Sequence, residues 1–395
     1  MRMILFAGKG GTGKTSLAAA TAALAAAAGK RTLVISLDPA HSLSDAFDRP
    51  VDLLAQAGQP ARVAENLWLQ EINVGQAIKE YWADVHAYLS LLLNTTGLDQ
   101  VVAEEIAILP GMEEISALLY INGYLKERAY DLLVLDCAPT AESIRFVAIP
   151  TALKWYMSRL FKMERTMAKL IRPIASRLTD LPLPGDDYFA CLERLSAGLG
   201  GVDEMLTDHT VTSVRLVTNP EKMVLKETQR AFMYFSLHGL MVESVIINRV
   251  WPQGDLGALS GYAASQAGYI EQAESYFGGV TLLRAPLQQR EVLGHGRLVD
   301  LGRQVYGERD VTGFMRADPP VSFSKTGGRM VVSLHLPFVA KGEVELNKVG
   351  DELVVEVGMV RRHLSLPASF AGAAPSRASF NGDRLEIEFN PAPEG

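Results

Sequence analysis

Several features are scarce in this chain of 395 residues. Its only cysteines, Cys137 and Cys191, stand too far apart in the sequence to form a CxxC zinc or redox pair, and so few thiols fit a reducing compartment. No uninterrupted apolar run approaches the length of a transmembrane helix. The formal net charge of −7 argues against a nucleic-acid binder that depends on phosphate contacts. Residues 1–6 are needed as a strand, which leaves no signal peptide. We therefore expect a soluble, cytoplasmic protein without a nucleic-acid partner.

The rest of the chain is organised around residues 8–15, which match the phosphate-binding pattern G-x-x-x-x-G-K-[ST]. A short buried strand is expected before this loop and an Ala-rich helix after it. Glycines let main-chain amides curl around phosphate oxygens, Lys14 adds positive charge, and the Thr15 hydroxyl would bind Mg²⁺. A glycine-rich turn without a ligand is the plain alternative, and the flanking strand and helix argue against it. The nucleotide-binding residues predicted here, with ATP and Mg²⁺ as cofactors, are Gly8, Lys9, Gly10, Gly11, Thr12, Gly13, Lys14, Thr15 and Ser16.

Lys9 makes this loop more specific. A second lysine directly after the first glycine resembles the deviant Walker A ATPases, which include partition, septum-site and anion-pump proteins. In that class this lysine reaches across a dimer interface to the partner's nucleotide. The resemblance therefore implies a homodimer in which Lys9 and Lys14 are both catalytic. A cation about 4 Å from a phosphate contributes about 4 kcal/mol at an effective dielectric constant of about 20. The alternative for Lys9 is a solvated surface lysine.

A second buried strand, residues 32–37, leads into residues 38–47, which read D-P-A-H-S-L-S-D-A-F. This segment resembles switch I of the family that contains the arsenite-pump ATPase ArsA and the ATPase that targets tail-anchored membrane proteins. In that family the aspartate orients or deprotonates the attacking water, and the resemblance gives this role to Asp38. Asp38 alone could instead be a helix N-cap. Residues 109–114 (L-P-G-M-E-E) also resemble the family and are expected to begin a helix.

Residues 131–136 read as a buried strand that ends in an acid, which is the Walker B arrangement. Asp136 is predicted to hold Mg²⁺ through water. Residues 137–145 follow and resemble the family's switch II, whose common form reads D-T-A-P-T-G-H-T-L-R from the Walker B aspartate onward. This chain departs from that form at Cys137, Ala141, Glu142 and Ser143. Alanine in place of glycine restricts the main chain, which puts the amplitude of switching in doubt.

Further nucleotide contacts follow from the resemblance alone. In the family an asparagine after a later strand hydrogen-bonds adenine, and a proline packs on the base; these positions match Asn248 and Pro286. Glu221 matches a family glutamate near the nucleotide and the dimer interface. Taken singly, Asn248 or Pro286 would more often be a turn residue at a strand end.

Residues 151–178 combine apolar side chains at helical spacing with many lysines and arginines. Such a stretch suits an adaptable surface for apolar partners, or an anionic membrane, or simply a helix that covers the protein's own core. In the family the segment after switch II forms the client-binding subdomain. The resemblance therefore implies hydrophobic clients, including tail-anchored polypeptides, or lipid as partners, and it allows a membrane-associated receptor. The candidate client-binding residues are Met157, Leu160, Met163, Met167 and Ile171.

After residue 307 the pattern changes to short alternating runs, with strands expected near residues 330–336, 343–346, 353–357 and 385–389. These runs resemble the α-crystallin (small heat-shock-protein) sandwich. The expected fold is α/β, a doubly wound and mostly parallel sheet of the P-loop class with a helical subdomain and a C-terminal all-β sandwich. The expected division is an ATPase domain at 1–305, with its helical subdomain at about 73–126 and 151–208, a linker at 306–320 and the sandwich at 321–392.

Three functions compete for what ATP hydrolysis drives. The first is a homodimeric, chaperone-like targeting factor for hydrophobic segments. The second is the soluble ATPase of an arsenite or anion efflux pump, which resembles this chain less because the pump's metalloid site uses a cluster of three cysteines and its chain carries two phosphate loops. The third is a positioning ATPase like MinD or ParA, which shares Lys9 and the loop but not residues 38–47.

Overall fold

The computed structural model describes residues 1–38, 42–49, 58–72, 76, 78–94, 111–178, 183–252, 257, 260–315, 317–326, 329–370 and 372–390. Within these ranges, the side chains of residues 169, 172–178 and 326 are not described. Everything below refers to this part of the chain.

The central element is an eight-stranded sheet in the order β3-β4-β2-β5-β1-β6-β7-β8. All neighbouring pairs are parallel except β3 and β4, so the predicted doubly wound, mostly parallel sheet is confirmed. β1, β2, β5 and β6 are buried along their whole length, as is typical of the inner strands of a parallel sheet that is covered on both faces. The strands are β1 (Arg2–Ala7), β2 (Thr32–Ser36), β3 (Ala61–Ala64), β4 (Leu67–Glu71), β5 (Leu132–Asp136), β6 (Thr212–Thr218), β7 (Val242–Val250) and β8 (Thr281–Pro286).

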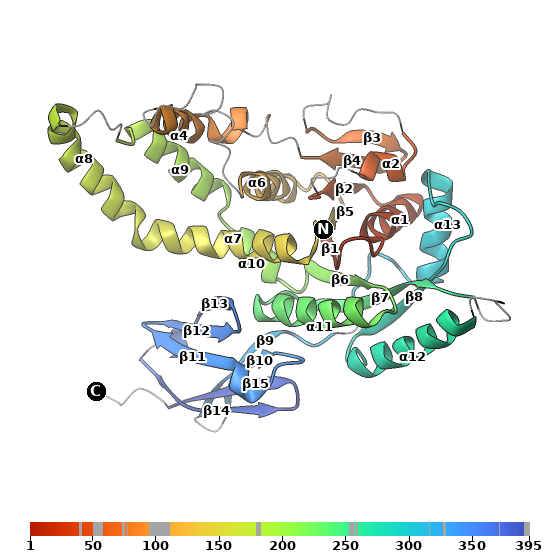
Figure 1. The fold of residues 1–395 in the computed structure, drawn as a ribbon. Coiled ribbons are helices and arrows are strands. Elements are labelled where there is room, and N and C mark those ends of the chain that lie inside the picture. Colours follow the sequence, from red (N-terminus) through yellow and green to blue (C-terminus); the bar gives the residue numbers. More distant parts are fainter. Residues whose placement is uncertain are drawn as a thin grey trace.

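Helices cover both faces of this sheet (Figure 1). One face packs against α1 (Lys14–Ala27), α2 (Leu43–Ala46) and α13 (His295–Tyr306). The alanines of α1 allow it to lie close to the sheet and to α13, where a side chain on Gly302 would meet the carbonyl oxygen of Ala20 at 2.9 Å. The other face packs against α6 (Met112–Glu127), α7 (Thr140–Arg159), α10 (Val202–Thr207), α11 (Lys222–Leu237) and α12 (Ser260–Tyr276).

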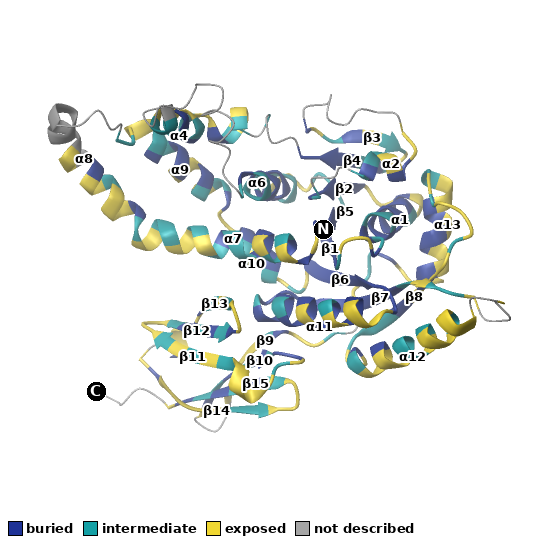
Figure 2. Ribbon diagram, in the orientation of Figure 1, coloured by how far each residue is buried: buried dark blue, intermediate teal, exposed yellow. Residues whose placement is uncertain are grey.

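A helical subdomain extends from the second face. It contains η2 (Ile78–Trp82), α4 (Ala83–Asn94), α8 (Phe161–Leu178) and α9 (Asp186–Gly198), and its core includes Trp82, Phe161 and Phe189. The stretch predicted to be helical over 151–178 belongs to two helices, because α7 ends at Arg159 and α8 begins at Phe161. Figure 1 shows α8 running away from the sheet, and Figure 2 shows that much of its described surface is exposed.

The C-terminal part is a sandwich of a four-stranded sheet, β14-β15-β10-β9, and a three-stranded sheet, β11-β12-β13. Apolar side chains that alternate along β10, β12 and β15 fill its core, which confirms the predicted all-β region. β9, β13 and β14 were not predicted. The strands are β9 (Val321–Thr326), β10 (Arg329–His335), β11 (Val344–Val349), β12 (Glu352–Val357), β13 (Val360–Ser365), β14 (Ala374–Asn381) and β15 (Arg384–Asn390), with short helices η4 (Lys341–Glu343) and η5 (Ala368–Phe370).

The segment between α13 and the sandwich is fastened to the sheet. Glu243, fully buried, accepts hydrogen bonds from Arg2 at 2.7 Å and Arg215 at 2.8 Å, and from the main-chain nitrogen of Met315 at 3.1 Å. Arg215 also donates to the carbonyl oxygen of Val311 at 2.8 Å. The first part of the expected linker, which includes Val311 and Met315, is therefore packed against the central sheet.

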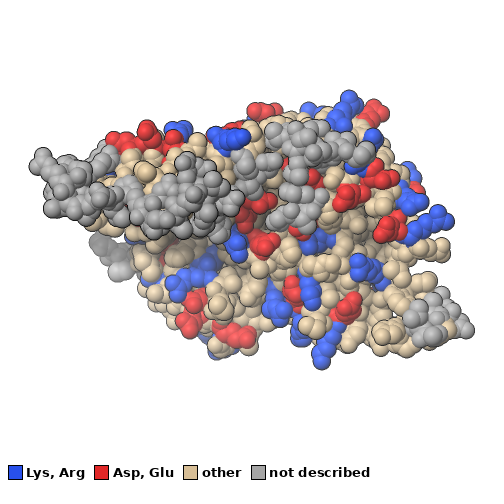
Figure 3. Space-filling view, turned by 45° about the horizontal axis from the view of Figure 1, so that its top comes forward, with Lys and Arg blue, Asp and Glu red and all other residues tan. Residues whose placement is uncertain are grey.

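The surface carries both signs of charge. On the face shown in Figure 3, the described lysines and arginines are interspersed with aspartates and glutamates, which does not favour a backbone-driven nucleic-acid contact there. Of the helices in the described ranges, none combines the length and the apolar character that crossing a bilayer requires.

Candidate functional site

The sequence motifs meet at one edge of the central sheet. Gly8 follows β1, Asp38 follows β2, Asp136 ends β5, Asn248 lies near the end of β7 and Pro286 ends β8. These strands are parallel, so their carboxyl ends lie on the same side of the sheet, which is where open α/β sheets bind ligands.

The phosphate loop, residues 8–15, has the glycines that its shape requires. Gly8 has φ +147°, and a Cβ there would lie 2.3 Å from the carbonyl oxygen of Val217. Gly13 has φ +92°, and a Cβ there would lie 2.3 Å from Nδ2 of Asn248. A side chain at either position would therefore push the loop away from the neighbouring strands.

The carbonyl oxygen of Lys9 organises the inside of the loop. It accepts hydrogen bonds from the Thr12 hydroxyl at 2.8 Å and from the Lys14 ammonium at 3.5 Å. Lys14 is buried, so its positive charge is directed into the loop and not into solvent. Among the described residues, the amides of Gly10, Gly11 and Gly13 have no hydrogen-bond partner. A ring of unused donors around a buried cation at a helix N-terminus is suited to a phosphate chain.

Asp136 is the most unusual carboxylate in the described part of the chain. It is fully buried, and neither of its oxygens has a hydrogen-bond partner of normal geometry there. Burial raises its pKa to about 7 and Asp38 adds to this, whereas the Thr15 hydroxyl and the Lys14 charge lower it. The Thr15 hydroxyl accepts a hydrogen bond from Ser42 at 3.4 Å. A buried acid without a partner, beside a threonine hydroxyl, suits a hard divalent cation.

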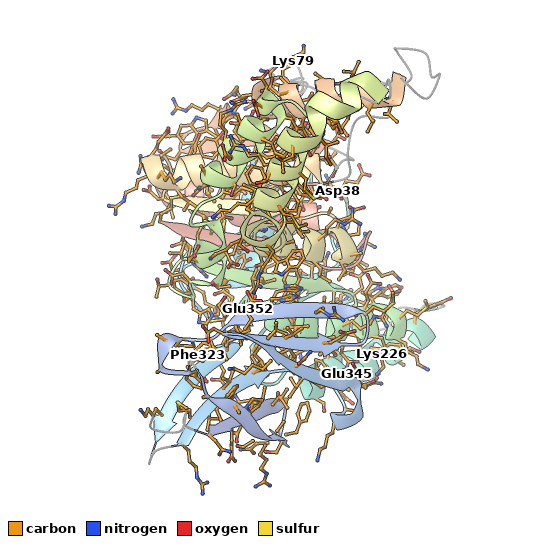
Figure 4. The ribbon with its side chains drawn as sticks, turned by 90° about the vertical axis from the view of Figure 1, so that its left-hand side faces the viewer. Asp38, Lys79, Lys226, Phe323, Glu345 and Glu352 are labelled. Carbon is orange, nitrogen blue, oxygen red and sulfur yellow. The ribbon has the colours of Figure 1, made fainter. Side chains whose placement is uncertain are left out.

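Asp38 lies at the start of the predicted switch I. Its main-chain nitrogen and carbonyl oxygen both contact the Ser36 hydroxyl at 3.4 Å, and its side chain is partly buried. Figure 4 shows Asp38 in the ATPase part of the molecule, above the sandwich. Its charge raises the pKa of Asp136 and of Glu113, so it lies within electrostatic reach of both. Pro39, Ala40 and His41, and the predicted Leu109-Pro110, lie outside the described residues.

An open cavity of about 1100 Å³ adjoins the loop. Gly13, Ser16, Asn248 and Pro286 all line it, so the predicted adenine contacts share one cavity with the phosphate loop. Nδ2 of Asn248 donates to the carbonyl oxygen of Thr12 at 2.7 Å. The sequence analysis did not name the charged residues of its wall as site residues, although Asp45 belongs to the switch I motif and Arg249 lies near the end of β7. These charged residues are Asp45, Asp48, Arg49, Arg249, Arg290 and Glu291.

The first residue of the switch II segment (residues 137–145), Cys137, is buried. Cys137 contacts the carbonyl oxygen of Leu135 at 3.8 Å, and burial raises the pKa of its thiol, so it behaves as a small apolar residue. Ala141 stands in the regular first turn of α7, a conformation that alanine adopts without strain. The hydroxyl of Thr140 donates to Glu227 of α11 at 3.1 Å, a contact that the sequence did not indicate.

The remaining candidates do not line the cavity beside the phosphate loop. Glu221 is exposed just before α11, as a contact with a second subunit would require. Met163, Met167 and Ile171 of α8 are 53%, 50% and 44% exposed. Met157 and Leu160, by contrast, are half-buried, and Met157 packs against the core of the helical subdomain.

Glu113, in the first turn of α6, was also missed as a site residue. Burial and the nearby Glu114, Glu142 and Asp38 raise its pKa to about 7. Its Oε1 is buried without a partner among the described residues. The signal was available in the L-P-G-M-E-E string, but nothing in the sequence tells which of its two glutamates turns inward.

Comparison with known proteins agrees with this geometry. A family model described as anion-transporting ATPase, ArsA, matches residues 1–307, and one described as the HSP20-like domain found in ArsA matches residues 327–389. Putative arsenical pump-driving ATPase 1 of Aquifex aeolicus is 44% identical over 98% of this chain and 99% of its own. A putative arsenical pump-driving ATPase of Chlorobaculum tepidum is 35% identical over 100% of this chain and 97% of its own. ATPase ASNA1 homolog 1 of Paramecium tetraurelia is 26% identical over 74% of this chain and 89% of its own. The chain is thus an ATP-hydrolysing enzyme, and it belongs to the ArsA family of anion-transporting ATPases.

Proposed function

We propose that this enzyme is a Mg²⁺-dependent homodimeric ATPase that captures apolar polypeptide segments on helix α8. The supporting observation is a stripe of large apolar side chains on one exposed face of that helix. We call this the client stripe: Met163, Met167, Leu170 and Ile171, which are 53%, 50%, 68% and 44% exposed.

The spacing of the client stripe places it on a single helix face, because residues three, four, seven and eight apart are neighbours on a helix. A different face of α8 carries Phe161 and Ala168, which are buried in the core of the helical subdomain. The helix is therefore already fastened to the protein by one apolar face while a second remains open. A row of exposed methionines and aliphatic residues of this kind favours an interaction surface for apolar partners of varied shape.

The chemistry of the cycle would use the site residues as follows. Lys14 and the loop amides bind the phosphates, Thr15 and Asp136 hold Mg²⁺, with Asp136 acting through water, and Asp38 orients the attacking water. Mg²⁺ would neutralise charge on the phosphate chain. Lys9 of one subunit would reach the nucleotide of the other, which requires the homodimer.

The second candidate function is to drive an arsenite pump, since two of the relatives described above are named as putative arsenical pump-driving ATPases. Arsenite requires several soft thiolate ligands at one site, and this chain has only Cys137 and Cys191, both buried. The exposed client stripe has no role in that function. We therefore favour polypeptide capture.

The test is binding of a fluorescent apolar helical peptide of about 20 residues, the length that crosses a bilayer. A Met163→Asp, Met167→Asp variant should lose capture and keep its ATPase activity and thermal stability. Met157 is left unchanged because it packs in the core. The matched control, Ser158→Asp with Thr166→Asp, adds the same charge at exposed positions outside the stripe.

Capture by the methionine variant at the wild-type level would exclude the stripe as the client site. Binding to anionic vesicles in place of the peptide, lost in the same variant, would overturn the polypeptide proposal in favour of a lipid surface.

A further inference from the structure

Helix α7 connects the nucleotide site with the client region. It begins at Thr140 in the switch II segment and ends at Arg159, directly before α8. Pro150 lies inside it. Because proline has no N–H, the helix loses one main-chain hydrogen bond there and becomes easier to bend. Residues 150–159, which we call the client half of α7, therefore need an outside support if movement at Thr140 is to reach α8.

Helix α10 gives part of that support. The Thr151 hydroxyl donates to Asp203 at 2.9 Å, and Lys154 pairs with Glu204 at 3.2 Å. The pair of Lys154 and Glu204 is exposed and contributes little. Asp203 is the more important contact because it is partly buried and lies within electrostatic reach of a second charged group.

That second charged group comes from the sandwich. Arg362 of β13 donates to the carbonyl oxygen of Leu237, at the C-terminal end of α11, where a cation interacts favourably with the helix dipole. Burial lowers the pKa of Arg362 to about 10, and the charge of Asp203 opposes this shift. Gly239, with φ +83°, makes room for the guanidinium, since a Cβ there would lie 2.6 Å from it. Arg362 thus joins the sandwich to α11, and its guanidinium lies within electrostatic reach of Asp203 on α10.

A second sandwich residue touches the client half directly. The ring of Trp155 lies 6.5 Å from that of His363, centroid to centroid. Nδ1 of His363 lies 3.3 Å from Glu352 on the neighbouring strand, which fixes the direction of the imidazole. Figure 4 shows Glu352 at the edge of the sandwich nearest the ATPase helices.

Helix α11 completes the connection. Near one end, Glu227 accepts the hydrogen bond from Thr140 of switch II. At the other end, Met233 and Leu237 belong to the apolar core of the sandwich. Rings from α11 and from the residue directly after α12 pack on the sandwich as well, with Phe338 lying 6.3 Å from Phe232 and 5.8 Å from Phe277. Both halves of α7 therefore contact the unit that α11 forms with the sandwich, the first through Thr140 and the second through Trp155.

We propose that the C-terminal sandwich positions the client half of α7: Arg362 and His363 hold it, through Asp203 and Trp155, so that movement of switch II passes Pro150 and reaches the client stripe. The sandwich is thereby a working part of the nucleotide cycle and not an appended domain. The assignment rests on the proposed function only in naming what α8 binds; the transmitted movement is independent of it.

The experiment measures the movement directly. Spin labels are placed at Ser158→Cys, in the client half, and at Glu308→Cys, after α13; both positions are exposed, while the native Cys137 and Cys191 are buried. The distance between labels is compared without nucleotide and with Mg²⁺ and a β,γ-imido analogue of ATP. Arg362→Met removes the charge and keeps the stem length. Arg361→Met is the matched control, because Arg361 is an exposed neighbour paired only with Glu356 in the described structure.

We expect the analogue to shift the distance in the wild type and in Arg361→Met, and we expect Arg362→Met to lose at least half of that shift while retaining basal ATPase activity. A full shift in Arg362→Met, or no shift in the wild type, would overturn the proposal. If Arg362→Met does not fold, His363→Ala replaces it, with the same expectation and the same contrary outcome. If the wild-type protein showed the nucleotide-dependent shift but did not capture the peptide, the proposed client function would be refuted and this inference would still stand.

Discussion

Nδ2 of Asn248 donates a hydrogen bond to the carbonyl oxygen of Thr12, with a nitrogen–oxygen distance of 2.7 Å. The other end of the same carboxamide accepts from the main-chain nitrogen of Arg249 at 2.8 Å. The end of β7 is thereby tied to the phosphate loop one residue before Gly13. Asn248 thus supports the loop and also faces the cavity in which the base of a nucleotide would lie.

Replacing Asn248 by alanine should weaken ATP binding and reduce the preference for ATP over GTP. A net hydrogen bond is worth about 0.5–1.5 kcal/mol, so a roughly 2- to 10-fold rise in Kd is expected. Equilibrium titration with fluorescent ATP and GTP analogues measures both effects. Gln288→Ala is the control, since Gln288 lines the same cavity but bonds to Pro286 and Gln304. Unchanged affinity and unchanged base preference in Asn248→Ala would remove this residue from base recognition.

Much of this site could be predicted because it depends on local sequence. Gly8, Asp38 and Asp136 each follow or end a run of buried apolar residues, and parallel pairing brings such ends together. Neither the order of the strands nor their contacts was needed to predict this. Asn248, by contrast, was predicted from the family resemblance alone. The switch II contact of Thr140 with Glu227 was not predictable in the same way, because it joins two helices distant in the sequence.

The sandwich shows where sequence patterns fail. β12 alternates cleanly between buried and half-buried residues and was predicted, whereas β13 places Arg361, Arg362 and His363 in succession and was not. Arg362 occupies an inward position because its guanidinium reaches α11, a requirement set by the tertiary fold. β14 is exposed along most of its length and so has no apolar alternation to find. The break between α7 and α8 was missed because helical spacing continues across Leu160.

Lys9→Ala should slow ATP hydrolysis by about 10²–10³-fold, the usual cost of losing one preorganised charge in the transition state. ATP binding should change little, because Thr12 and Lys14 bond to the main-chain oxygen of Lys9, which alanine keeps. Single-turnover kinetics and equilibrium binding separate the two effects. Lys14→Ala, by comparison, should weaken binding itself. A wild-type enzyme that hydrolyses ATP while sedimenting as a monomer at every concentration would rule out action of Lys9 across a dimer.

Asp38→Asn should retain ATP and Mg²⁺ but turn over about 10²–10⁴-fold more slowly, the range for losing a positioned base. The contacts of Asp38 with Ser36 use its main-chain atoms, so the amide variant should keep these two contacts. The measurement is kcat, with Kd for ATP as the internal control. If Asp38→Asn turned over at the wild-type rate, another group would have to orient the water.

The last prediction concerns His238, which follows α11 at the joint with the sandwich. Burial and the adjacent Arg362 lower its pKa from 6.5 to about 4, and its Nε2 is buried without a partner among the described residues. In the unfolded chain the imidazole takes up a proton below about pH 6.5, whereas in the folded protein it does so only near pH 4. The neutral His238 therefore contributes fully to the free energy of unfolding above pH 6.5. This contribution is lost as the pH falls, by at most about 1.4 kcal/mol per pH unit.

Between about pH 7 and about pH 5, the wild type should accordingly lose about 1–2 kcal/mol more free energy of unfolding than His238→Gln, measured by urea denaturation. Asp136 and Glu113 act in the opposite sense, because their pKa values are raised to about 7 and their protonation on acidification favours the folded state. Both carboxylates are present in both proteins, so the difference between wild type and variant isolates the histidine. Equal slopes in the wild type and His238→Gln would show that His238 titrates as freely when folded as when unfolded, and the joint with the sandwich would then be open to solvent.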